Sequence, residues 1–264
     1  MSLFRKAALV IALATFAAGS ATVAFADAER ASGSLDLQAE LRLRSNLGGC
    51  PPPPGVSECA ARTAAGLAPG LGSVTESYEF LVGLGPPSCA PGLGRALGTS
   101  VRFVVAGKGE IHFALAEGGC ISQVEPIYNQ LQAYTITGGT GLYAGASGSG
   151  TVVRRLGDST AAGRHGREAW TGTLQVSALE FDTTRPTLSG ATSKTVRAAH
   201  GASTARVRFT VTAQDDRDGV VLVRCTPRSG SRFRIGRTRV TCEATDVSAN
   251  AATASFTVTV RARR

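Results

Sequence analysis

Hydrophobic and polar residues alternate with a period of two along much of the chain, and no segment keeps the ~3.6-residue period of an amphipathic helix. From Ser34 to Leu43, the four leucines and one alanine at every second position would share one face of an extended chain. Each such segment predicts a half-buried strand, and the glycine, proline and serine clusters between segments predict turns. Seven strands are predicted in the first part of the chain: Ser34–Leu43, Val74–Gly83, Thr99–Ala106, Glu110–Glu117, Leu131–Thr137, Ser147–Leu156 and Glu168–Leu179.

The alternation restarts in the last third of the chain. Between Ala205 and Ala213, the residues Val207, Phe209 and Val211 face one way, while arginines and threonines face the other. Further strands are predicted at Val220–Cys225, Thr238–Ala244 and Phe256–Val260. Alternation of this kind over several short strands is what two packed antiparallel sheets require.

Strands that follow one another without helices predict an all-β chain, with an antiparallel barrel or sandwich first and a β-sandwich second. The segment 182–187 is interpreted as a linker between a disulfide-containing barrel domain at 27–181 and a sandwich domain at 188–264. Charge supports this division. Residues 27–185 hold 12 basic and 14 acidic side chains, a net charge of −2, whereas residues 186–264 hold 14 basic and 5 acidic ones, a net charge of +9.

The first 26 residues have the pattern of a secretory signal peptide. Arg5 and Lys6 precede an apolar run, and Ala24 and Ala26 place small residues where a signal peptidase cleaves. The alternative is a membrane anchor, but the apolar run is shorter than the roughly 20 residues that span a bilayer. We therefore predict an extracellular, secreted protein without membrane insertion. The 25 arginines against 3 lysines, with abundant alanine and glycine, favour a bacterial source.

Six cysteines follow the predicted signal peptide, and an even number outside the cytoplasm predicts three disulfides. Cys50 and Cys59 flank a loop of four prolines and are placed to close it. Cys89 and Cys120 would then pair by elimination. In the last third of the chain, Cys225 and Cys242 remain for the third bridge, which would stabilise that domain by roughly 3 kcal/mol. Metal binding is the alternative, but the sequence contains no Cys-x-x-Cys pair.

The basic segment resembles a known extracellular module. Three stretches are similar to the hyalin repeat (HYR) module: Cys225–Cys242, Ala244–Asp246 with Asn250, and Phe256–Val260. The sequence departs from the family's pattern at Arg234, where proline is usual, and at Ala249, where glycine usually precedes the asparagine. The resemblance implies an immunoglobulin-like β-sandwich, found in extracellular and often adhesive proteins. It implies neither catalysis nor a common ligand.

A glycine-rich stretch follows the strand predicted at Leu131–Thr137. Its Gly139-x-Gly141-x-x-Ala144 nominally fits a dinucleotide-binding fingerprint, which must open a helix. Because more glycines and another strand pattern follow, we interpret the stretch as a tight hairpin with close backbone packing. The segment 109–152 resembles the allene oxide cyclase-like and dirigent-like β-barrels. That resemblance implies an eight-stranded barrel able to hold an apolar ligand, but no catalytic residue of those families matches a residue here.

Arginine is the strongest charge feature of the last third. The candidate anion-binding residues are Arg224, Arg228, Arg232, Arg234, Arg237 and Arg239. Such a cluster attracts nucleic acid, an anionic polysaccharide or an anionic wall polymer; the alternative is a basic surface that aids solubility without a specific ligand. Nucleic acid is the least favoured partner, because aromatic residues for base stacking are scarce in this segment.

Other candidate residues carry weaker signals. Asp215, Asp216 and Asp218 offer carboxylate oxygens for calcium, but the ligand series of an EF-hand is absent and a solvated turn is the simpler interpretation. The histidines, His112, His165 and His200, are dispersed, and no nucleophile-elbow pattern occurs. We therefore assign no catalytic residue and predict no cofactor.

These observations favour a non-enzymatic secreted protein that binds or adheres to a cell surface or matrix. The expected partner is an anionic cell-surface polysaccharide or an extracellular protein. We do not expect the protein to bind nucleic acid. The alternative is cyclase-like or dirigent-like activity of the barrel on a small apolar ligand. A cluster of ionisable residues in a roomy barrel would favour that alternative, whereas a barrel filled by apolar side chains would argue against it. A structural spacer without a ligand is a third interpretation.

Overall fold

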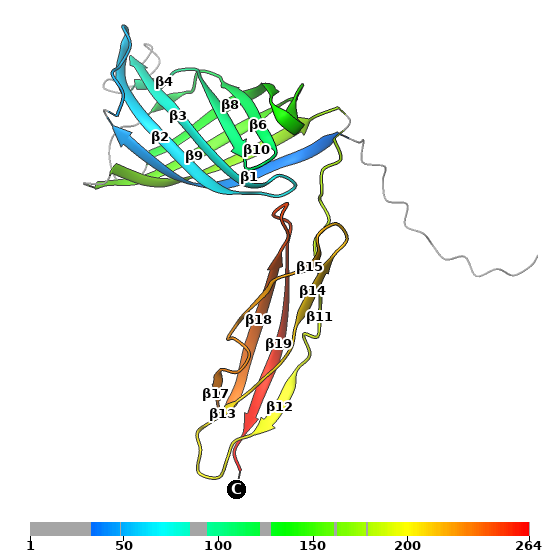
Figure 1. Ribbon diagram of the computed structural model, residues 1–264. Helices are drawn as coiled ribbons and strands as arrows, with labels where there is room; N and C mark the ends of the chain where they lie inside the picture. The colour runs from blue at the N-terminus through cyan, green and yellow to red at the C-terminus, as the bar shows by residue number, and fades with distance from the viewer. Residues whose placement is uncertain are drawn as a thin grey trace, which may run out of the picture. The chain divides into compact units, whose positions relative to one another are not determined.

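The computed structural model describes residues 33–47, 49–84, 94–121, 128–160, 163–177 and 179–263. The predicted signal peptide lies outside these residues. The described chain consists of nineteen strands and one short 3₁₀ turn, and no α-helix occurs within it (Figure 1). In the same ranges, the search for a helix long and apolar enough to cross a membrane finds none. The prediction of an all-β chain is confirmed.

The first ten strands form one antiparallel sheet that closes on itself. Their bounds are β1 Ser34–Leu47, β2 Val56–Ala68, β3 Gly72–Leu84, β4 Gly94–Ala96, β5 Thr99–Val105, β6 Gly109–Leu115, β7 Cys120–Ile121, β8 Tyr128–Gly139, β9 Ser147–Thr160 and β10 Gly163–Gln175. The order β1–β2–β3–β5–β6–β8–β9–β10 returns to β1, while β4 pairs with β3 and β7 with β4. This closed ring is an eight-stranded barrel, as the resemblance to the allene oxide cyclase-like and dirigent-like barrels implied.

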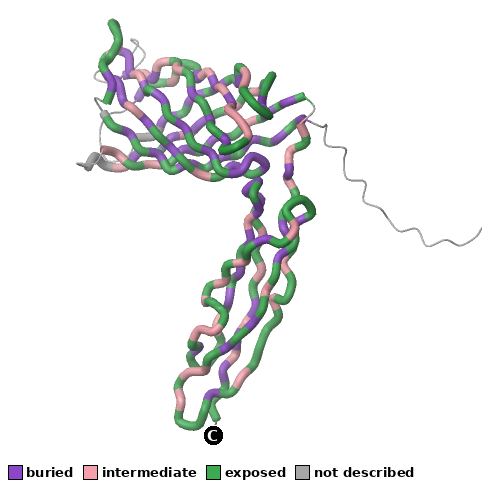
Figure 2. The backbone as a smooth tube through the Cα atoms, in the orientation of Figure 1, coloured by how far each residue is buried: buried purple, intermediate pink, exposed green. Residues whose placement is uncertain are grey.

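The alternating pattern places one face of every long strand inside the barrel (Figure 2). On β1, the predicted inward residues from Leu35 to Leu43 are at most 5% exposed. Four rings form an aromatic cluster in the interior, with neighbouring centroids 4.5–5.2 Å apart. Its members are Phe103, Phe113, Tyr134 and Trp170. Burial of this apolar surface is the main source of the barrel's stability.

Strand β2 was missed by the sequence pattern, and its composition explains why. It contains five alanines and few large apolar side chains, so the alternation is weak. Its inward side carries Ala60 and Ala64 beside the buried Arg62. Small residues here leave space for the longer side chains of the opposite wall. Hydrogen bonding to β1 and β3 on both sides compensates for the low strand propensity of alanine.

The glycine-rich stretch forms a hairpin rather than a nucleotide-binding turn. Strand β8 passes through the 3₁₀ turn η1, Gly141–Tyr143, directly into β9, so no helix opens here. Gly141 has φ +60°, and a Cβ atom on it would lie 2.4 Å from the Lys108 carbonyl oxygen. A Cβ on Gly139 would lie 2.4 Å from the Glu110 carbonyl oxygen. The interpretation of these glycines as tight-turn and close-packing residues is confirmed.

Strands β11–β19 form three small sheets around separate hydrophobic clusters. Their bounds are β11 Thr187–Ser189, β12 Lys194–Arg197, β13 Thr204–Arg206, β14 Thr212–Asp215, β15 Gly219–Val221, β16 Val223–Thr226, β17 Arg232–Arg234, β18 Gly236–Thr245 and β19 Ala251–Arg261. The sheets are β11–β14–β15, β12–β19–β18–β16 and β13–β17. Val240, Cys242 and Ala244 share the buried face of β18, as predicted.

The strand predicted at 205–213 is divided in the structure. Of its inward residues, Val207, Phe209 and Ala213 are buried and Val211 is half-buried, but only its ends, in β13 and β14, pair as strands. Between them, the Ser229 hydroxyl accepts a hydrogen bond from the Phe209 backbone nitrogen at 2.9 Å and donates one to the Phe209 carbonyl oxygen at 2.6 Å. A side chain thus replaces the missing neighbour strand, which an alternation pattern cannot reveal.

The predicted disulfides Cys50–Cys59 and Cys225–Cys242 are present. The second joins directly opposed residues of β16 and β18. Cys120 is also disulfide-bonded, whereas Cys89, its predicted partner, lies outside the described residues. Among the described cysteines none is free.

Candidate functional site

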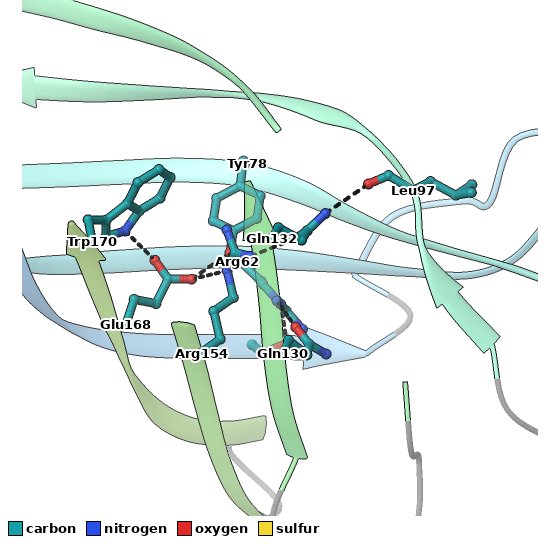
Figure 3. Close-up of polar contacts among 9 residues, drawn as sticks. Arg62, Tyr78, Leu97, Gln130, Gln132, Arg154, Glu168 and Trp170 are labelled. Carbon is teal, nitrogen blue, oxygen red and sulfur yellow. Dashed lines mark hydrogen bonds and ion pairs between the residues drawn. The ribbon is translucent and has the colours of Figure 1, made fainter. Parts of the chain in front are cut away.

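A buried ion pair and its hydrogen bonds cross the barrel interior (Figure 3). Arg154 on β9 and Glu168 on β10 are both fully buried, with Nε 2.6 Å from Oε1. The Tyr78 hydroxyl donates to the same oxygen at 2.6 Å, and Trp170 Nε1 donates to Oε2 at 3.2 Å. Arg154 Nη1 also donates to Gln132 Oε1 at 2.6 Å. Each of these side chains therefore has a partner, as buried charges require, and of the Arg154 nitrogens only Nη2 is buried without a hydrogen bond.

A second carboxyl group lies beside this pair. Glu76 on β3 is 4% exposed, and neither of its carboxyl oxygens accepts a hydrogen bond. Burial raises the pKa of Glu76 well above its usual value, and the nearby Glu168 carboxylate raises it further. Burial, the largest single influence, disfavours the charge on Glu168, but attraction to Arg154 and Arg62 together with hydrogen bonding outweighs it and lowers the pKa of Glu168 to about 2. Of the two carboxyl groups, Glu76 is therefore the one whose surroundings favour the protonated form, and Glu168 the one whose surroundings favour the ionised form.

A second arginine, Arg62 on β2, is 3% exposed. Its Nη1 donates to Gln130 Oε1 at 2.9 Å and its Nε to Ser45 Oγ at 3.3 Å, while the guanidinium lies 3.5 Å from the centroid of the Phe80 ring. Burial lowers the pKa of Arg62. Arg62 borders a small cavity of about 80 Å³, lined by Ser45, Glu58, Ala60, Arg62, Phe80, Val82, Ile121, Gln130, Leu156 and Arg164.

The described barrel interior offers little space for chemistry. Sites for small molecules usually measure about 300–1,000 Å³, several times the volume of this cavity. Glu76, Tyr78 and Glu168 are absent from the lining of this cavity. Glu76 instead borders an open groove of about 360 Å³, whose other lining residues belong to β1, β2 and β3. The aromatic cluster fills another part of the barrel. Neither the predicted apolar ligand nor the cyclase-like alternative therefore gains support from the described residues.

Sequence reasoning missed the buried network, although a signal for it exists. Arg154 lies between Val152 and Leu156, two residues to either side, and both of these point inward. A charged residue at an inward position of an alternating strand predicts a buried polar group, and Glu168 two residues before Trp170 gives the same signal. Which charges meet depends on the pairing of β3, β9 and β10, which the sequence did not supply.

All six predicted anion-binding arginines are exposed, but they do not form one patch. Arg237 and Arg239 lie on the outward face of β18. Arg224 on β16 faces Glu243, so its charge is partly balanced. The remaining three, Arg228, Arg232 and Arg234, lie in or before β17.

Strand pairing adds three arginines that the sequence did not single out. Arg197 on β12 lies directly opposite Arg261 on β19, on the same outward face as Arg237 and Arg239. We call these four residues the basic face. Arg206 on β13 lies opposite Arg232 in the neighbouring sheet. Within the described residues, neither the four arginines of the basic face nor Arg206 and Arg232 take part in an ion pair.

A groove of about 660 Å³ opens beside the disulfide Cys225–Cys242. It separates the unpaired segment 209–211 from β16 and is lined partly by Arg224 and Arg228. Leu222 on its edge is 72% exposed. Apolar, hydroxyl and basic groups therefore meet at one open surface of the basic segment.

The predicted calcium residues do not all lie together. Asp215 is 4% exposed, whereas Asp216 and Asp218 are exposed. Asp215 and Asp218 join Asp182 and Asp246 in a compact group that excludes Asp216. Burial raises the pKa of Asp182, and the Asp246 and Asp215 carboxylates raise it further.

The histidines remain apart from these sites. His112 hydrogen-bonds Glu110 at 3.1 Å on the barrel, and His165 and His200 are exposed.

Comparison with known families matches the HYR domain to residues 181–260. The carboxyl-terminal segment is an HYR domain. Hyalin from Strongylocentrotus purpuratus is 42% identical over 91 residues, which are 34% of this chain and 8% of hyalin. The chain therefore covers only a small part of hyalin's length. No solved structure matches the chain.

The HYR match begins before the predicted domain boundary at residue 188 and includes the predicted linker 182–187. Asp182 in that segment is 7% exposed, and its backbone oxygen accepts a hydrogen bond from Asn250 Nδ2 at 3.0 Å. The start of the segment is thus packed against the rest of the HYR domain.

Proposed function

We propose that this is a secreted, adhesion-type protein that uses the basic face of its HYR domain to hold an anionic polysaccharide. The observation that carries the proposal is the set of four exposed arginines on one sheet face, with Arg197 directly opposite Arg261. Like charges opposite each other in a sheet are destabilising. A bound polyanion would neutralise these charges. The barrel also has opposed arginines, but its segment has a net charge of −2, whereas residues 186–264 have a net charge of +9.

The distribution of acidic residues supports the same proposal. Only five acidic side chains occur between residues 186 and 264. Three of them, Asp215, Asp218 and Asp246, converge at one place and do not neutralise the basic face. The face therefore keeps a positive potential, which concentrates and steers anionic partners.

The neighbours of the basic face favour a carbohydrate over a nucleic acid. Thr257 and Thr259 lie opposite Arg239 and Arg237, and Arg239 Nη2 donates to Ser255 Oγ at 3.2 Å. Hydroxyl groups suit the hydrogen bonding of sugars. Phe209, Phe233 and Phe256 are at most 7% exposed and cannot stack on bases.

The extracellular setting is part of the proposal. The signal-peptide pattern of residues 1–26 and the disulfides favour secretion. The chain is also 42% identical to hyalin over 91 residues. A bacterial source remains an inference from composition, with 25 arginines and 3 lysines.

The test compares full-chain secreted variants on immobilised alginate, a carboxylated polysaccharide, at low ionic strength. The basic-face variant carries Arg237→Gln, Arg239→Gln and Arg261→Gln. The control variant carries Arg42→Gln, Arg155→Gln and Arg167→Gln, which removes three exposed, mutually opposed arginines from the barrel.

We expect the basic-face variant to bind about tenfold more weakly, because three exposed charge contacts are lost. The control variant should keep nearly the wild-type affinity. Equal weakening of the two variants would show that net charge alone governs binding, and would refute the proposal.

A further inference from the structure

Four carboxylates from separate parts of the HYR segment converge on one point. Asp182 precedes β11, Asp215 ends β14, Asp218 lies in the turn before β15, and Asp246 follows β18. One oxygen from each lies within 4.8 Å of the corresponding oxygens of the other three. Residues 186–264 have a net charge of +9, so this local concentration of negative charge differs from the charge of the segment as a whole.

A buried, unpartnered oxygen lies in this group. Asp215 is 4% exposed, and its Oδ1 accepts hydrogen bonds from the backbone nitrogens of Arg217 and Asp218, both at 3.0 Å. Its Oδ2 is enclosed and accepts no hydrogen bond. An ionised oxygen without a partner is costly to bury. A bound cation would supply the missing partner.

Backbone donors hold Asp182 and Asp218 in place, and each of these two carboxylates uses only part of its capacity to accept hydrogen bonds. The Thr184 nitrogen donates to Asp182 Oδ1 at 3.1 Å, and the Val247 nitrogen donates to Asp218 Oδ2 at 2.9 Å. Asp182 and Asp218 each use one oxygen in these hydrogen bonds and can offer the second to another partner. The group is therefore oriented before any ligand arrives.

Asp246 is fixed most firmly. Its two oxygens accept from the backbone nitrogen and Nδ2 of Asn250, at 2.7 and 2.8 Å. Asn250 Nδ2 also reaches the backbone oxygen of Asp182. The side chain of Asn250 thus links the segment that carries Asp246 to the segment that carries Asp182.

Nearby cations do not neutralise the group. Arg217 is the arginine closest to it in sequence, and its Nη2 lies 3.5 Å from Glu180 Oε2. Among the described residues, no ion pair involves any of the four aspartates.

We propose that Asp182, Asp215, Asp218 and Asp246 bind one Ca²⁺ ion. Calcium takes oxygen ligands at about 2.3–2.6 Å, so ligands on opposite sides of the ion lie up to roughly 5 Å apart. The observed limit of 4.8 Å fits that span. Magnesium needs near-octahedral ligands at about 2.0–2.1 Å and usually keeps several waters, which suits four converging carboxylates less well. The group contains no histidine or cysteine, the usual ligands of zinc.

The ion would join three stretches that are far apart in sequence: the entry into the HYR domain at Asp182, the β14–β15 turn and the turn after β18. Calcium sites of extracellular modules have dissociation constants of about 0.1–1 mM. We therefore expect calcium at extracellular concentrations to order this end of the domain.

The test uses the full-chain secreted protein, stripped of metal with a chelator and titrated with CaCl₂ in a calorimeter. We expect one ion per chain, and at saturating calcium a rise in the unfolding midpoint of roughly 3–5 °C. Asp218→Asn should weaken calcium binding at least about tenfold while its side-chain oxygen still accepts from Val247. Asp216→Asn is the matched control, because Asp216 is an exposed neighbour outside the group, and it should bind as wild type does.

Asp215→Asn provides a second variant and should bind no calcium. If it fails to fold, the pair Asp218→Asn and Asp216→Asn still decides the question. The proposal is overturned if the wild type shows no calcium binding up to about 10 mM, well above the expected range. Equal weakening by Asp216→Asn, or magnesium binding as tight as calcium, would overturn it as well.

Discussion

Ala249 adopts a backbone conformation that favours glycine. Its φ is +66°, and no other described residue apart from glycine has a positive φ. It lies between Asp246 and Asn250, in the turn whose side chains hydrogen-bond each other. A Cβ atom in this left-handed region costs roughly 1–2 kcal/mol. The hydrogen bonds of the turn and the burial of Ala249, which is 6% exposed, offset that cost.

Ala249→Gly is therefore predicted to stabilise the protein. Part of the gain is lost because glycine has more freedom in the unfolded chain, so the free energy of unfolding should rise by about 0.5–1 kcal/mol. Urea denaturation of the full chain with a chelator present measures this. Ala251→Gly, at an exposed strand position two residues later, should have the opposite sign. If both variants destabilise alike, Ala249 is not strained.

Two glutamates in the barrel carry opposite pH dependences. The pKa of Glu168 is lowered, so its contribution to stability is present above its unfolded pKa and is lost as the pH falls towards about 2. The pKa of Glu76 is raised, so the folded state keeps the proton of this group to a higher pH than the unfolded state does. Glu76 therefore stabilises the fold in acid and destabilises it as the pH rises.

Glu76→Gln is predicted to raise the free energy of unfolding at pH 7.5 by roughly 1–3 kcal/mol, because a neutral amide can donate to Glu168 without binding a proton. The gain should vanish near pH 4, where Glu76 is protonated in both states. Glu168→Gln should instead destabilise by about 3–5 kcal/mol, because Arg154 loses its buried partner. Thermal unfolding across a pH series measures both. A pH-independent effect of Glu76→Gln would contradict the assigned protonation.

At the scale of strands, the barrel depends on close approach between β8, β9 and β10. A Cβ atom on Gly172 would lie 2.3 Å from the Ser149 carbonyl oxygen and 2.5 Å from the Tyr134 hydroxyl oxygen. Tyr134 belongs to the aromatic cluster, and its hydroxyl donates to the Thr171 carbonyl oxygen at 3.2 Å. The glycine therefore makes room for an aromatic ring inside a packed wall.

Gly172→Ala is predicted to destabilise the barrel by about 1–3 kcal/mol, the usual cost of overpacking a core. Gly157→Ala is the matched control, since its Cβ would meet only the His165 carbonyl oxygen at 3.6 Å, an ordinary contact. Urea midpoints of the two variants provide the measurement. Similar losses in both would mean that the close packing at Tyr134 does not limit the barrel.

The sequence predicted those strands whose inward residues are large and apolar, such as β1 and β18. It missed β2, where alanines and an inward arginine weaken the alternation. It identified Asp215 and Asp218 but could not add Asp182 and Asp246, because those residues come together only through the fold. For the same reason, Arg197 and Arg261 became part of the basic face only once the register of β12 and β19 was known.

At the scale of the whole molecule, the barrel and the HYR domain differ in whether their main charged residues are buried or exposed. The barrel places its most consequential charges inside, where Arg154 and Glu168 stabilise a filled interior. The HYR domain holds its arginines outside, with a net charge of +9 for residues 186–264. This contrast makes the HYR domain, rather than the barrel interior, the expected contact surface.

The most direct test of this account is the salt dependence of alginate binding by the full chain. A polyanion releases condensed counterions when bound cations neutralise it, so the logarithm of the binding constant falls linearly with the logarithm of salt concentration. We predict a steep negative slope for the wild type. For the variant with Arg237→Gln, Arg239→Gln and Arg261→Gln, we predict a shallower slope of log K against log salt. The slope should be smaller in magnitude by roughly 3 or less, because at most three fewer counterions are released on binding. Absent or salt-insensitive binding, or the same slope in both proteins, would contradict a role for the basic face.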